Sequence, residues 1–303
     1  LANGKSKAEN LLMSKDVIAA IKTIKKLGIK VKLKKSTCEI YGKGINGYQI
    51  KKNLIINAEN SGTLGRLILG LLINIPHSIK LVGDKSLSKR DFKRVSDPLS
   101  NFGANFKLTN KKNLPLVLRG SSNLKPFKYQ ENRGSAQCKS AVIFGGMRTE
   151  GTTYIRAKKS RNHTELLCKY LKLPIKIRER KKYDLIEVNK VKKIKTLNYK
   201  IPSDISSAAF FMALIALSNN SELIIRNVNI NPSRLGIITI LKKMGVRIMF
   251  RNKKNYKGEE QADIKIKSPK KLKAINFPSA LNSCAIDEFL VIFLVAAKAK
   301  GIS

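Results

Sequence analysis

Residues 234–250, RLGIITILKKMGVRIMF, show the pattern that decides the fold. Apolar residues first recur with the 3.6-residue period of an amphipathic helix, and a β-rich segment follows the helix stop at once. The same pattern occurs three more times, at residues 16–33, 92–108 and 163–177. The four stop residues, which are Gly or Pro because both disfavour continuation of a helix, are Gly28, Gly103, Pro174 and Gly245. Because these stops recur at a nearly constant interval, the sequence predicts a repeated α/β unit.

A second pattern alternates with the first: a few small or polar residues precede a nearly all-apolar helix, and a strand signal follows. Its copies are residues 60–72, 134–147, 203–217 and 284–299. The predicted unit is therefore helix, strand, helix, strand and strand, about 72 residues long. Apolar helices that open with small residues are expected to be buried, with their N-termini at a common surface that can bind anions.

Composition limits the class of protein. A chain of 303 residues favours two domains, and its longest apolar run, Phe289–Ala297, is too short to cross a bilayer. The net charge of +41 is spread along the chain without a basic arm, and there is no Trp on which bases could stack. We expect most lysines to lie on solvated faces; a field that collects small polyanions is the alternative. Nucleic acid and membranes are not expected partners.

The cysteines predict the cellular compartment, and the chain ends predict that this sequence is part of a longer one. Cys38, Cys138, Cys168 and Cys284 are widely separated, so they fit neither a metal site nor a compact disulfide framework, and they favour a reducing compartment. The first unit lacks its first helix and the last stops at the entry to a strand. We therefore expect a fragment that lacks both termini.

Seven segments together resemble the EPSP synthase (3-phosphoshikimate 1-carboxyvinyltransferase) family. They are NAENSGTLGRL (57–67), GDKSLSKRDFKRV (83–95), GSAQCKSA (134–141), SRNHTE (160–165), IPSDISSAAFF (201–211), NPSRLGIITILKKMG (231–245) and IDEF (286–289). The resemblance implies an α/β, two-domain inside-out α/β barrel, the enolpyruvyl transferase fold, built from repeated βαβαββ units with the active site in the cleft between the domains. It places a three-repeat N-terminal domain with an incomplete first repeat at 1–200, and a truncated C-terminal domain at 201–303.

The activity that this resemblance implies is transfer of the enolpyruvyl group of phosphoenolpyruvate to the 5-hydroxyl of shikimate 3-phosphate, with release of phosphate. This step belongs to the shikimate pathway, which leads to chorismate and the aromatic amino acids. The resemblance implies no metal and no organic cofactor, a cytoplasmic monomer, and inhibition by glyphosate at the phosphoenolpyruvate site.

The candidate ligands of phosphoenolpyruvate are Gly62, Arg90 and Gln137. Residues 60–63 alone indicate a helix N-cap with free amides facing an anion, and a plain cap is the alternative. By resemblance Gly62 lies against phosphoenolpyruvate, and Arg90 holds it with a bidentate guanidinium. Asp91 and Phe92 stand where the family usually has Pro and Met.

The candidate ligands of shikimate 3-phosphate are Ser135, Ala136, Gln137, Ser160, Arg161 and Asp287. The hydroxyl, amide and backbone donors of residues 135–137 suit a phosphorylated sugar-like ligand, and simple capping by Ser135 is the alternative. By resemblance Ser160 and Arg161 grip the phosphate.

Asp287 is the candidate catalytic residue, a carboxylate at the mouth of an apolar helix. By resemblance it accepts the proton of the attacking hydroxyl, and compensation of the helix dipole is the alternative. We expect His163 to be a first-turn helix residue rather than a catalytic one.

Two other functions remain as alternatives. The first is the related transferase acting on UDP-N-acetylglucosamine, although the cysteines here do not lie in a mobile loop. The second is an RNA 3'-terminal phosphate cyclase or an RNA-binding protein, since either would use the positive charge of the chain. The cyclase reaction, however, needs a histidine, and this chain has none in a suitable position.

Overall fold

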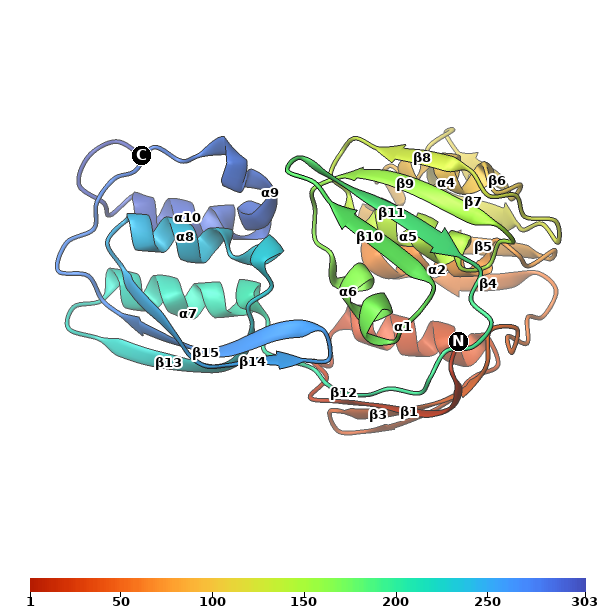
Figure 1. Cartoon of the computed structure of the whole chain (residues 1–303), viewed down its shortest axis with the longest axis horizontal. Coiled ribbons are helices and arrows are strands. Elements are labelled where there is room, and N and C mark those ends of the chain that lie inside the picture. Colours follow the sequence, from red (N-terminus) through yellow and green to blue (C-terminus); the bar gives the residue numbers. More distant parts are fainter. The chain divides into compact units, whose positions relative to one another are not determined.

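The computed structural model describes residues 1–303 apart from the side chain of Ala280. The chain divides into two compact units. Unit 1 comprises Leu1–Lys159 and Cys168–Ile201, and unit 2 comprises Ser160–Leu167 and Pro202–Ser303 (Figure 1). The chain therefore passes from one unit to the other after residues 159, 167 and 201, and each unit is described by itself.

The described residues of unit 1 form three four-stranded mixed sheets that share one topology. In each, the first two strands in spatial order are parallel and the following pairs are antiparallel. One sheet takes its first strand from residues 198–200, far along the chain from its neighbour. In spatial order the sheets are β12 (Asn198–Lys200), β1 (Asn3–Glu9), β3 (Thr37–Lys43) and β2 (Lys30–Lys34); β4 (Leu54–Asn57), β5 (Ser78–Val82), β7 (Asn113–Arg119) and β6 (Asn105–Thr109); and β8 (Lys128–Glu131), β9 (Thr152–Lys158), β11 (Tyr183–Asn189) and β10 (Ile175–Glu179).

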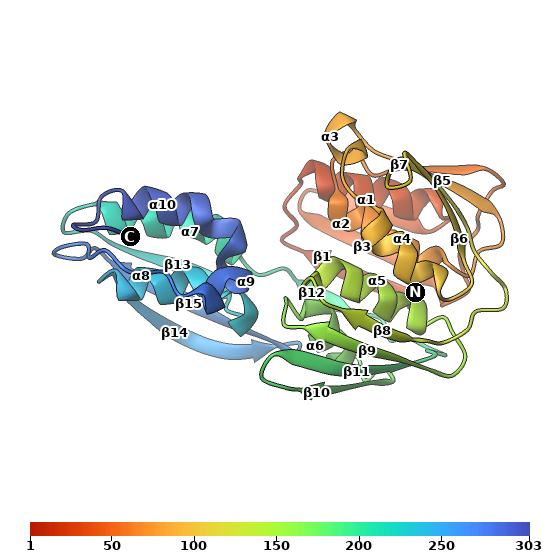
Figure 2. The same ribbon diagram turned by 90° about the horizontal axis from the view of Figure 1, so that it is seen from above.

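The helices of unit 1 lie between these sheets, except for the short α3 (Lys85–Ser88), which projects from the loop after β5 (Figures 1 and 2). They are α1 (Lys15–Lys26), α2 (Gly62–Leu72), α3, α4 (Lys93–Ser100), α5 (Ala136–Gly146) and α6 (His163–Tyr170), whose first turns belong to unit 2. Helices α2 and α5 approach so closely that a Cβ atom on Gly70 would lie 2.1 Å from the Ala141 carbonyl oxygen. Their N-termini also lie near one another, since Gln137 Nε2 donates to Thr63 Oγ1 at 2.8 Å.

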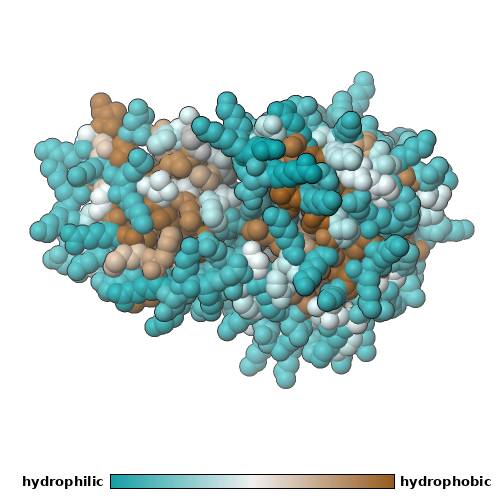
Figure 3. Space-filling view, viewed as in Figure 1, coloured by the Kyte–Doolittle hydropathy of each residue, from teal (hydrophilic) through white to brown (hydrophobic). Residues whose placement is uncertain are grey.

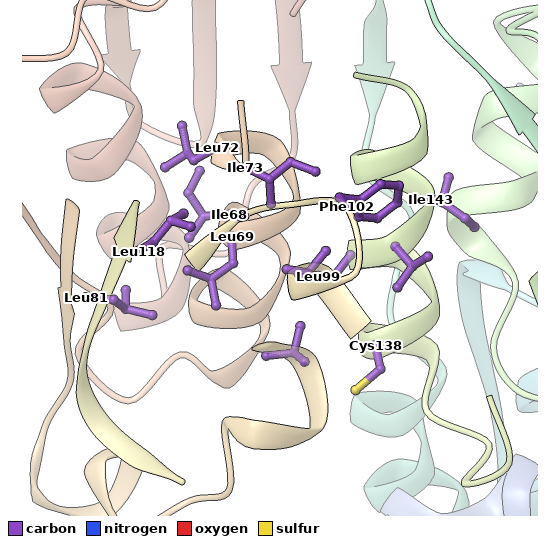
Figure 4. Packing of buried hydrophobic residues seen from close by; sticks show 14 of the residues in the cluster. Ile68, Leu69, Leu72, Ile73, Leu81, Leu99, Phe102, Leu118, Cys138 and Ile143 are labelled. Carbon is purple, nitrogen blue, oxygen red and sulfur yellow. The ribbon is translucent and has the colours of Figure 1, made fainter. Parts of the chain in front are cut away.

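The core of unit 1 forms where α2, α4 and α5 meet the inner faces of the strands. Leu69, Leu99 and Phe102 are fully buried there, and Figure 4 shows the Phe102 ring beside Ile143. Burial of each such side chain contributes roughly 1.5–3 kcal/mol. The buried apolar faces thus hold the helices that open at the candidate site.

Unit 2 has a separate core over one three-stranded antiparallel sheet. Its strands, in spatial order, are β13 (Glu222–Asn229), β15 (Glu259–Lys267) and β14 (Arg247–Tyr256). Helices α7 (Ile205–Leu217) and α8 (Gly236–Lys243) cover one face of this sheet, and α10 (Phe289–Ala296) packs against these two helices (Figure 1). Unit 2 also contains the short helix α9 (Asn282–Ala285) and the 3-10 turns η1 (Pro232–Arg234), η2 (Ser279–Leu281) and η3 (Ile286–Glu288). A parallel bridge from Ser203 to Val228 occupies the position that the first strand has in the sheets of unit 1.

The predicted order of elements is confirmed in three copies. They are α2-β5-α4-β6-β7, α5-β9-α6-β10-β11 and α7-β13-α8-β14-β15. Gly28, Gly103 and Gly245 have left-handed backbones with φ of 78°, 102° and 98°, as the predicted helix stops require. After α6, however, the left-handed residue is Lys172, with φ of 54°, and Pro174 lies two residues beyond it.

The expectation that all the apolar helices are buried is wrong for α7 and α10. Helix α2 is covered on several sides, whereas the described part of unit 2 covers α7 with its sheet and with α10 but leaves an outer face open. Phe210, Leu214, Leu290 and Phe293 are exposed there. Figure 3 shows brown apolar patches between the teal polar side chains. Among the described residues, none of the helices combines the length and apolar character that crossing a bilayer requires.

Candidate active site

Gly62 opens helix α2 at a point where two arginine side chains converge. Ser61 caps the helix by accepting a hydrogen bond from the amide of Leu64 at 3.2 Å. A Cβ atom on Gly62 would lie 2.9 Å from Nη1 of Arg66 and 3.2 Å from Nη1 of Arg90. Two guanidinium groups thus lie against the Gly62 backbone, an arrangement that suits a phosphate or carboxylate group.

Arg90 reaches Gly62 from the turn after α3. Its Nη2 donates to Asn60 Oδ1 at 3.2 Å, and Asn60 Nδ2 donates to Asp84 Oδ2 at 2.6 Å. Hydrogen bonds from Asn60 and from the Leu87 amide hold the pKa of the Asp84 carboxyl below its usual range. Asn60 therefore links Arg90 to an ionised carboxylate while leaving other guanidinium donors for a ligand.

Asp91 and Phe92, which differ from the family pattern, fix the backbone that follows Arg90. Asp91 Oδ1 accepts hydrogen bonds from the amides of Lys93 at 2.8 Å and Arg94 at 3.4 Å, which caps α4. Phe92 is fully buried in the core. These two residues hold the segment in place by capping and by burial.

Arg66 was not predicted as a site residue, yet it lies between Gly62 and Gln137 in unit 1. It is 8% exposed, and its Nη1 donates to Gln137 Oε1 at 2.6 Å. Its Nε has no hydrogen-bond partner among the described residues. Burial, and then the neighbouring charge of Arg94, lower the pKa of Arg66. The available signal was that Arg66 is the lone charged residue of an otherwise apolar helix, residues 62–72.

Gln137 connects the start of α5 with the start of α2. Its Oε1 accepts the bond from Arg66, and its Nε2 donates to Thr63 Oγ1 at 2.8 Å. Ser135 caps α5 by accepting from the Cys138 amide at 3.3 Å. The structure thus brings Gln137 together with the surroundings of Gly62.

Glu131 fixes the loop before α5 and was also not predicted. The buried carboxylate accepts hydrogen bonds from three successive amides, those of Arg133 at 3.0 Å, Gly134 at 2.7 Å and Ser135 at 3.0 Å. Such an arrangement leaves the loop few alternative conformations. Glu131 therefore sets where residues 135–137 begin.

In unit 2 the structure brings Arg161 and Asp287 together. Arg161 Nη2 forms an ion pair with Asp287 Oδ2, and both side chains are partly exposed. Asp287 lies in the turn η3, just before α10. The Oγ atom of Ser160 is buried with no hydrogen-bond partner among the described residues. The candidate phosphate ligand and the candidate base thus belong to one body.

A hydrogen-bonded network that includes the buried Glu288 lies beside this pair. Ser206 Oγ donates to Glu288 Oε1, and Arg234 donates to Ser206 Oγ at 2.6 Å. Arg234 Nη1 also pairs with Asp204 Oδ1 at 2.8 Å. Burial raises the pKa of the Glu288 carboxyl, which is 3% exposed, against the opposing effects of Ser206 and Arg234. The network ties η3 to the start of α7.

His163 is the first residue of α6, as predicted. Its ring is not free, however, because Nδ1 lies 2.7 Å from Glu259 Oε1. The described residues contain no group of three or more His, Cys, Asp or Glu side chains placed to hold a metal ion.

The helix starts of unit 1 gather two arginines and an amide, and unit 2 pairs an arginine with a carboxylate, so both units of this repeated α/β framework are suited to bind small anions. The model of the family described as EPSP synthase (3-phosphoshikimate 1-carboxyvinyltransferase) matches residues 1–303. The chain belongs to this family, whose members transfer the enolpyruvyl group of phosphoenolpyruvate to shikimate 3-phosphate in aromatic amino acid biosynthesis.

Individual relatives agree with this membership. The chain is 38% identical over 307 residues to the 3-phosphoshikimate 1-carboxyvinyltransferase of Hydrogenovibrio crunogenus, and 39% identical over 303 residues to that of Ruthia magnifica. Both alignments cover 99% of this chain and 68% of the relative. The solved EPSP synthase from Acinetobacter baumannii is 33% identical with a TM-score of 0.88, again over 99% of this chain and 68% of that one. The enolpyruvyl transferase NikO from Streptomyces tendae is 14% identical with a TM-score of 0.72 over 99% of this chain and 68% of that one, and it shows likeness of fold alone.

Proposed function

We propose that this chain performs the family reaction with Asp287 as the proton acceptor and Arg161 as the phosphate ligand of shikimate 3-phosphate. The observation that carries the proposal is the ion pair of these two side chains in unit 2. A dianionic phosphate competes well for a guanidinium group. When the substrate phosphate takes Arg161, the Asp287 carboxylate loses its partner and can accept a proton from the substrate.

The chemistry that follows has two stages. Asp287 accepts the proton of the 5-hydroxyl as the hydroxyl oxygen forms a bond to C2 of phosphoenolpyruvate. The C2=C3 double bond takes a proton from a general acid at C3, giving a tetrahedral adduct. The C2–O bond to phosphate then breaks as C3 gives a proton back to a general base, which leaves the enol ether and inorganic phosphate. This sequence requires a base near the hydroxyl, an acid near the methylene carbon and cations around the phosphate groups.

For phosphoenolpyruvate we propose the cluster at Gly62, with Arg90 and Gln137 as ligands. Support comes from the two guanidinium groups against the Gly62 backbone and from the partnerless buried Nε of Arg66. Two cationic groups can neutralise the phosphate or carboxylate that approaches the helix start. Arg66 supplies one of these charges and also orients the Gln137 amide through its hydrogen bond to Oε1.

For the remaining contacts of shikimate 3-phosphate we propose Ser135, Ala136, Gln137 and Ser160. Ser135 and Gln137 offer a hydroxyl and an amide at the start of α5, and the buried Ser160 Oγ lacks a partner among the described residues. A buried hydroxyl without a partner is costly, and a phosphate oxygen would satisfy it.

We further propose that the two units correspond, apart from residues 160–167 and 201, to the two domains, 1–200 and 201–303, of an inside-out α/β barrel of repeated βαβαββ units. The common topology of the three sheets in unit 1 supports this, as does the Ser203 to Val228 bridge in unit 2. A cytoplasmic location is proposed from the four free thiols, which suit a reducing compartment. A monomer is proposed from the family resemblance, and size-exclusion chromatography with light scattering tests it.

Equilibrium binding of shikimate 3-phosphate, together with phosphate release in the presence of both substrates, tests the proposed function. Arg161→Ala should weaken shikimate 3-phosphate binding by about 10-fold or more, because a charged hydrogen-bond partner is lost. Arg178→Ala is the matched control, since Arg178 is an exposed arginine paired with Glu187 in unit 1. Failure of the parent chain to bind shikimate 3-phosphate, or equal losses in both variants, would overturn the proposal.

A further inference from the structure

The segment Ser160–His163 lies between two anchors that belong to different units. On the unit 1 side, Lys159 Nζ pairs with Asp184 Oδ1 at 2.5 Å, and Asp184 is buried. From Ser160 onward the segment belongs to unit 2, although unit 1 resumes at Cys168. The change of unit thus falls directly before the proposed phosphate ligands.

Two side chains after Arg161 fasten the segment to unit 2. Asn162 Oδ1 accepts a hydrogen bond from Asn231 Nδ2 at 2.9 Å. His163 Nδ1 lies 2.7 Å from Glu259 Oε1, so the ring donates to the ionised carboxylate from this nitrogen. Asn162 and His163 therefore each have a partner on a different element of unit 2, the loop after β13 and the start of β15.

The partners form a rigid receptor, because they are buried and bonded to one another. Asn229, Asn231 and Glu259 are all buried. Asn229 Nδ2 donates to Glu259 Oε2, and Asn229 Oδ1 accepts from the Asn231 amide at 3.0 Å. Asn231 Oδ1 accepts from the amide of Ser233 at 2.9 Å and from its hydroxyl at 2.7 Å.

His163 stabilises the ionised form of the buried Glu259 carboxylate. Burial by itself would raise the pKa of Glu259, but hydrogen bonding and charge from His163, and then hydrogen bonds from Asn229 and Asn231, bring that pKa below its usual range. A buried carboxylate that loses such a partner is costly. The contact is therefore a strong constraint on where residue 163 lies.

We infer that Asn162 and His163 are positioning residues. They hold the proposed phosphate ligands, Ser160 and Arg161, in a fixed position in unit 2, which also carries Asp287. The inference rests on the proposed function. One substrate molecule presents its phosphate to Arg161 and its reacting hydroxyl to Asp287, so these two groups must keep a fixed separation. Residues 160 and 161 lie in sequence between two parts of unit 1, and the bonds of residues 162 and 163 hold them with unit 2.

His163→Ala and His163→Asn test the inference in the full chain. An asparagine amide nitrogen occupies nearly the place of the histidine Nδ1, so it can still donate to Glu259. We expect His163→Ala to raise the Kd for shikimate 3-phosphate by about 10-fold or more, since small misplacements of a ligand are costly. His163→Asn should restore most of the affinity. The Kd for phosphoenolpyruvate should change by less than about 2-fold, because its proposed ligands all belong to unit 1.

Controls separate positioning from general damage. His77→Ala removes an exposed histidine that lies outside the segment and should leave both affinities unchanged. Amide hydrogen exchange should show faster exchange at residues 160–163 in His163→Ala than in the parent, and a normal rate in His163→Asn.

The possible failures are distinguishable. A parent chain that does not bind shikimate 3-phosphate refutes the proposed function, and the inference with it. A parent that binds it, with His163→Ala binding equally well, refutes the inference alone. Equal losses for both substrates, or no rescue by His163→Asn, would reduce His163 to a residue of general stability and likewise refute it.

Discussion

Substitution of Gly62 by alanine probes the proposed phosphoenolpyruvate site with a single methyl group. The added Cβ would lie 2.9 Å from Nη1 of Arg66 and 3.2 Å from Nη1 of Arg90, where ordinary contacts begin at 3.4 Å. Both distances are therefore too short, and the overlap with Arg66 is the larger of the two. Both contacts are with the ends of flexible side chains, so the helix itself should remain intact.

The two arginines can yield only by weakening other contacts. Arg66 is held by its 2.6 Å bond to Gln137 and lies 5.3 Å from the Phe92 ring centroid, and Arg90 is held by Asn60. The methyl group also occupies the space through which a ligand approaches the backbone. Glyphosate is longer than phosphoenolpyruvate and should meet the methyl group more severely. Discrimination by one methyl-sized clash is roughly 1–3 kcal/mol, or about 10- to 200-fold.

Steady-state inhibition by glyphosate, titrated against phosphoenolpyruvate, measures this discrimination. We expect competitive inhibition of the parent, and an inhibition constant that rises in Gly62→Ala more than the KM for phosphoenolpyruvate does. Gly146→Ala is the matched control, because its methyl group would crowd Thr153 and Val188 at 3.2 Å, at the far end of α5, with no arginine among the nearest atoms. Noncompetitive or absent inhibition of the parent, equal losses for both ligands, or the same discrimination in Gly146→Ala would remove Gly62 from the site.

Three further changes test other parts of the site. Asp287→Ala should lower kcat far more than it weakens phosphoenolpyruvate binding, and an unchanged kcat would leave Asp287 as a helix-dipole residue. Because burial raises the pKa of Glu288, the stability that this group contributes is present at pH values below its unfolded pKa and is lost as pH rises through the folded value. Glu288→Gln should therefore raise Tm relative to the parent at pH 8 but not at pH 4, and a gain at both would contradict the assignment. Glu131→Gln should destabilise the chain by roughly 1–3 kcal/mol in urea unfolding, since an amide cannot accept from all three loop amides; no loss would show that the loop is held otherwise.

The order of the elements was predictable because its signals are local. A helix stop such as Gly245 and an apolar period act within a few residues, so they can be recognised without knowing the partners. The pairing of residues 198–200 with β1 was not predictable, since those strands lie nearly the whole of unit 1 apart in sequence. That Ser160–Leu167 belongs to unit 2 was not predictable for the same reason. It depends on hydrogen bonds between Asn162 and Asn231 and between His163 and Glu259, residues that lie far apart in the sequence.

The candidate site was predictable to a similar degree. Resemblance located Gly62, Arg90, Gln137, Arg161 and Asp287 in motifs, and the structure adds which of them contact one another within each unit. The resemblance gave no indication of Arg66 and Glu131, which support the site because they are buried and hydrogen-bonded to its residues and loops. A charged residue inside an apolar helix and a carboxylate just before a helix cap are the two sequence signals that could have found Arg66 and Glu131.

The repeated unit accounts for where the arginines of the site lie. Arg90, Arg161 and Arg234 each come shortly before the second helix of a unit, at α4, α6 and α8, so they recur with the period of the repeat. Each donates to a polar side chain close to the start of an apolar helix: Asn60, Asp287 and Asp204 respectively. The partner decides what the arginine can do. A neutral amide leaves the charge of Arg90 available, and a phosphate can displace the half-exposed carboxylate from Arg161. The pairing of Arg234 with Asp204 is reinforced by Ser206, which bonds in turn to the buried Glu288. In the proposed function, this one repeated position therefore has three different tasks: binding an anion, exchanging a base for a substrate phosphate, and fixing the turn that carries the base.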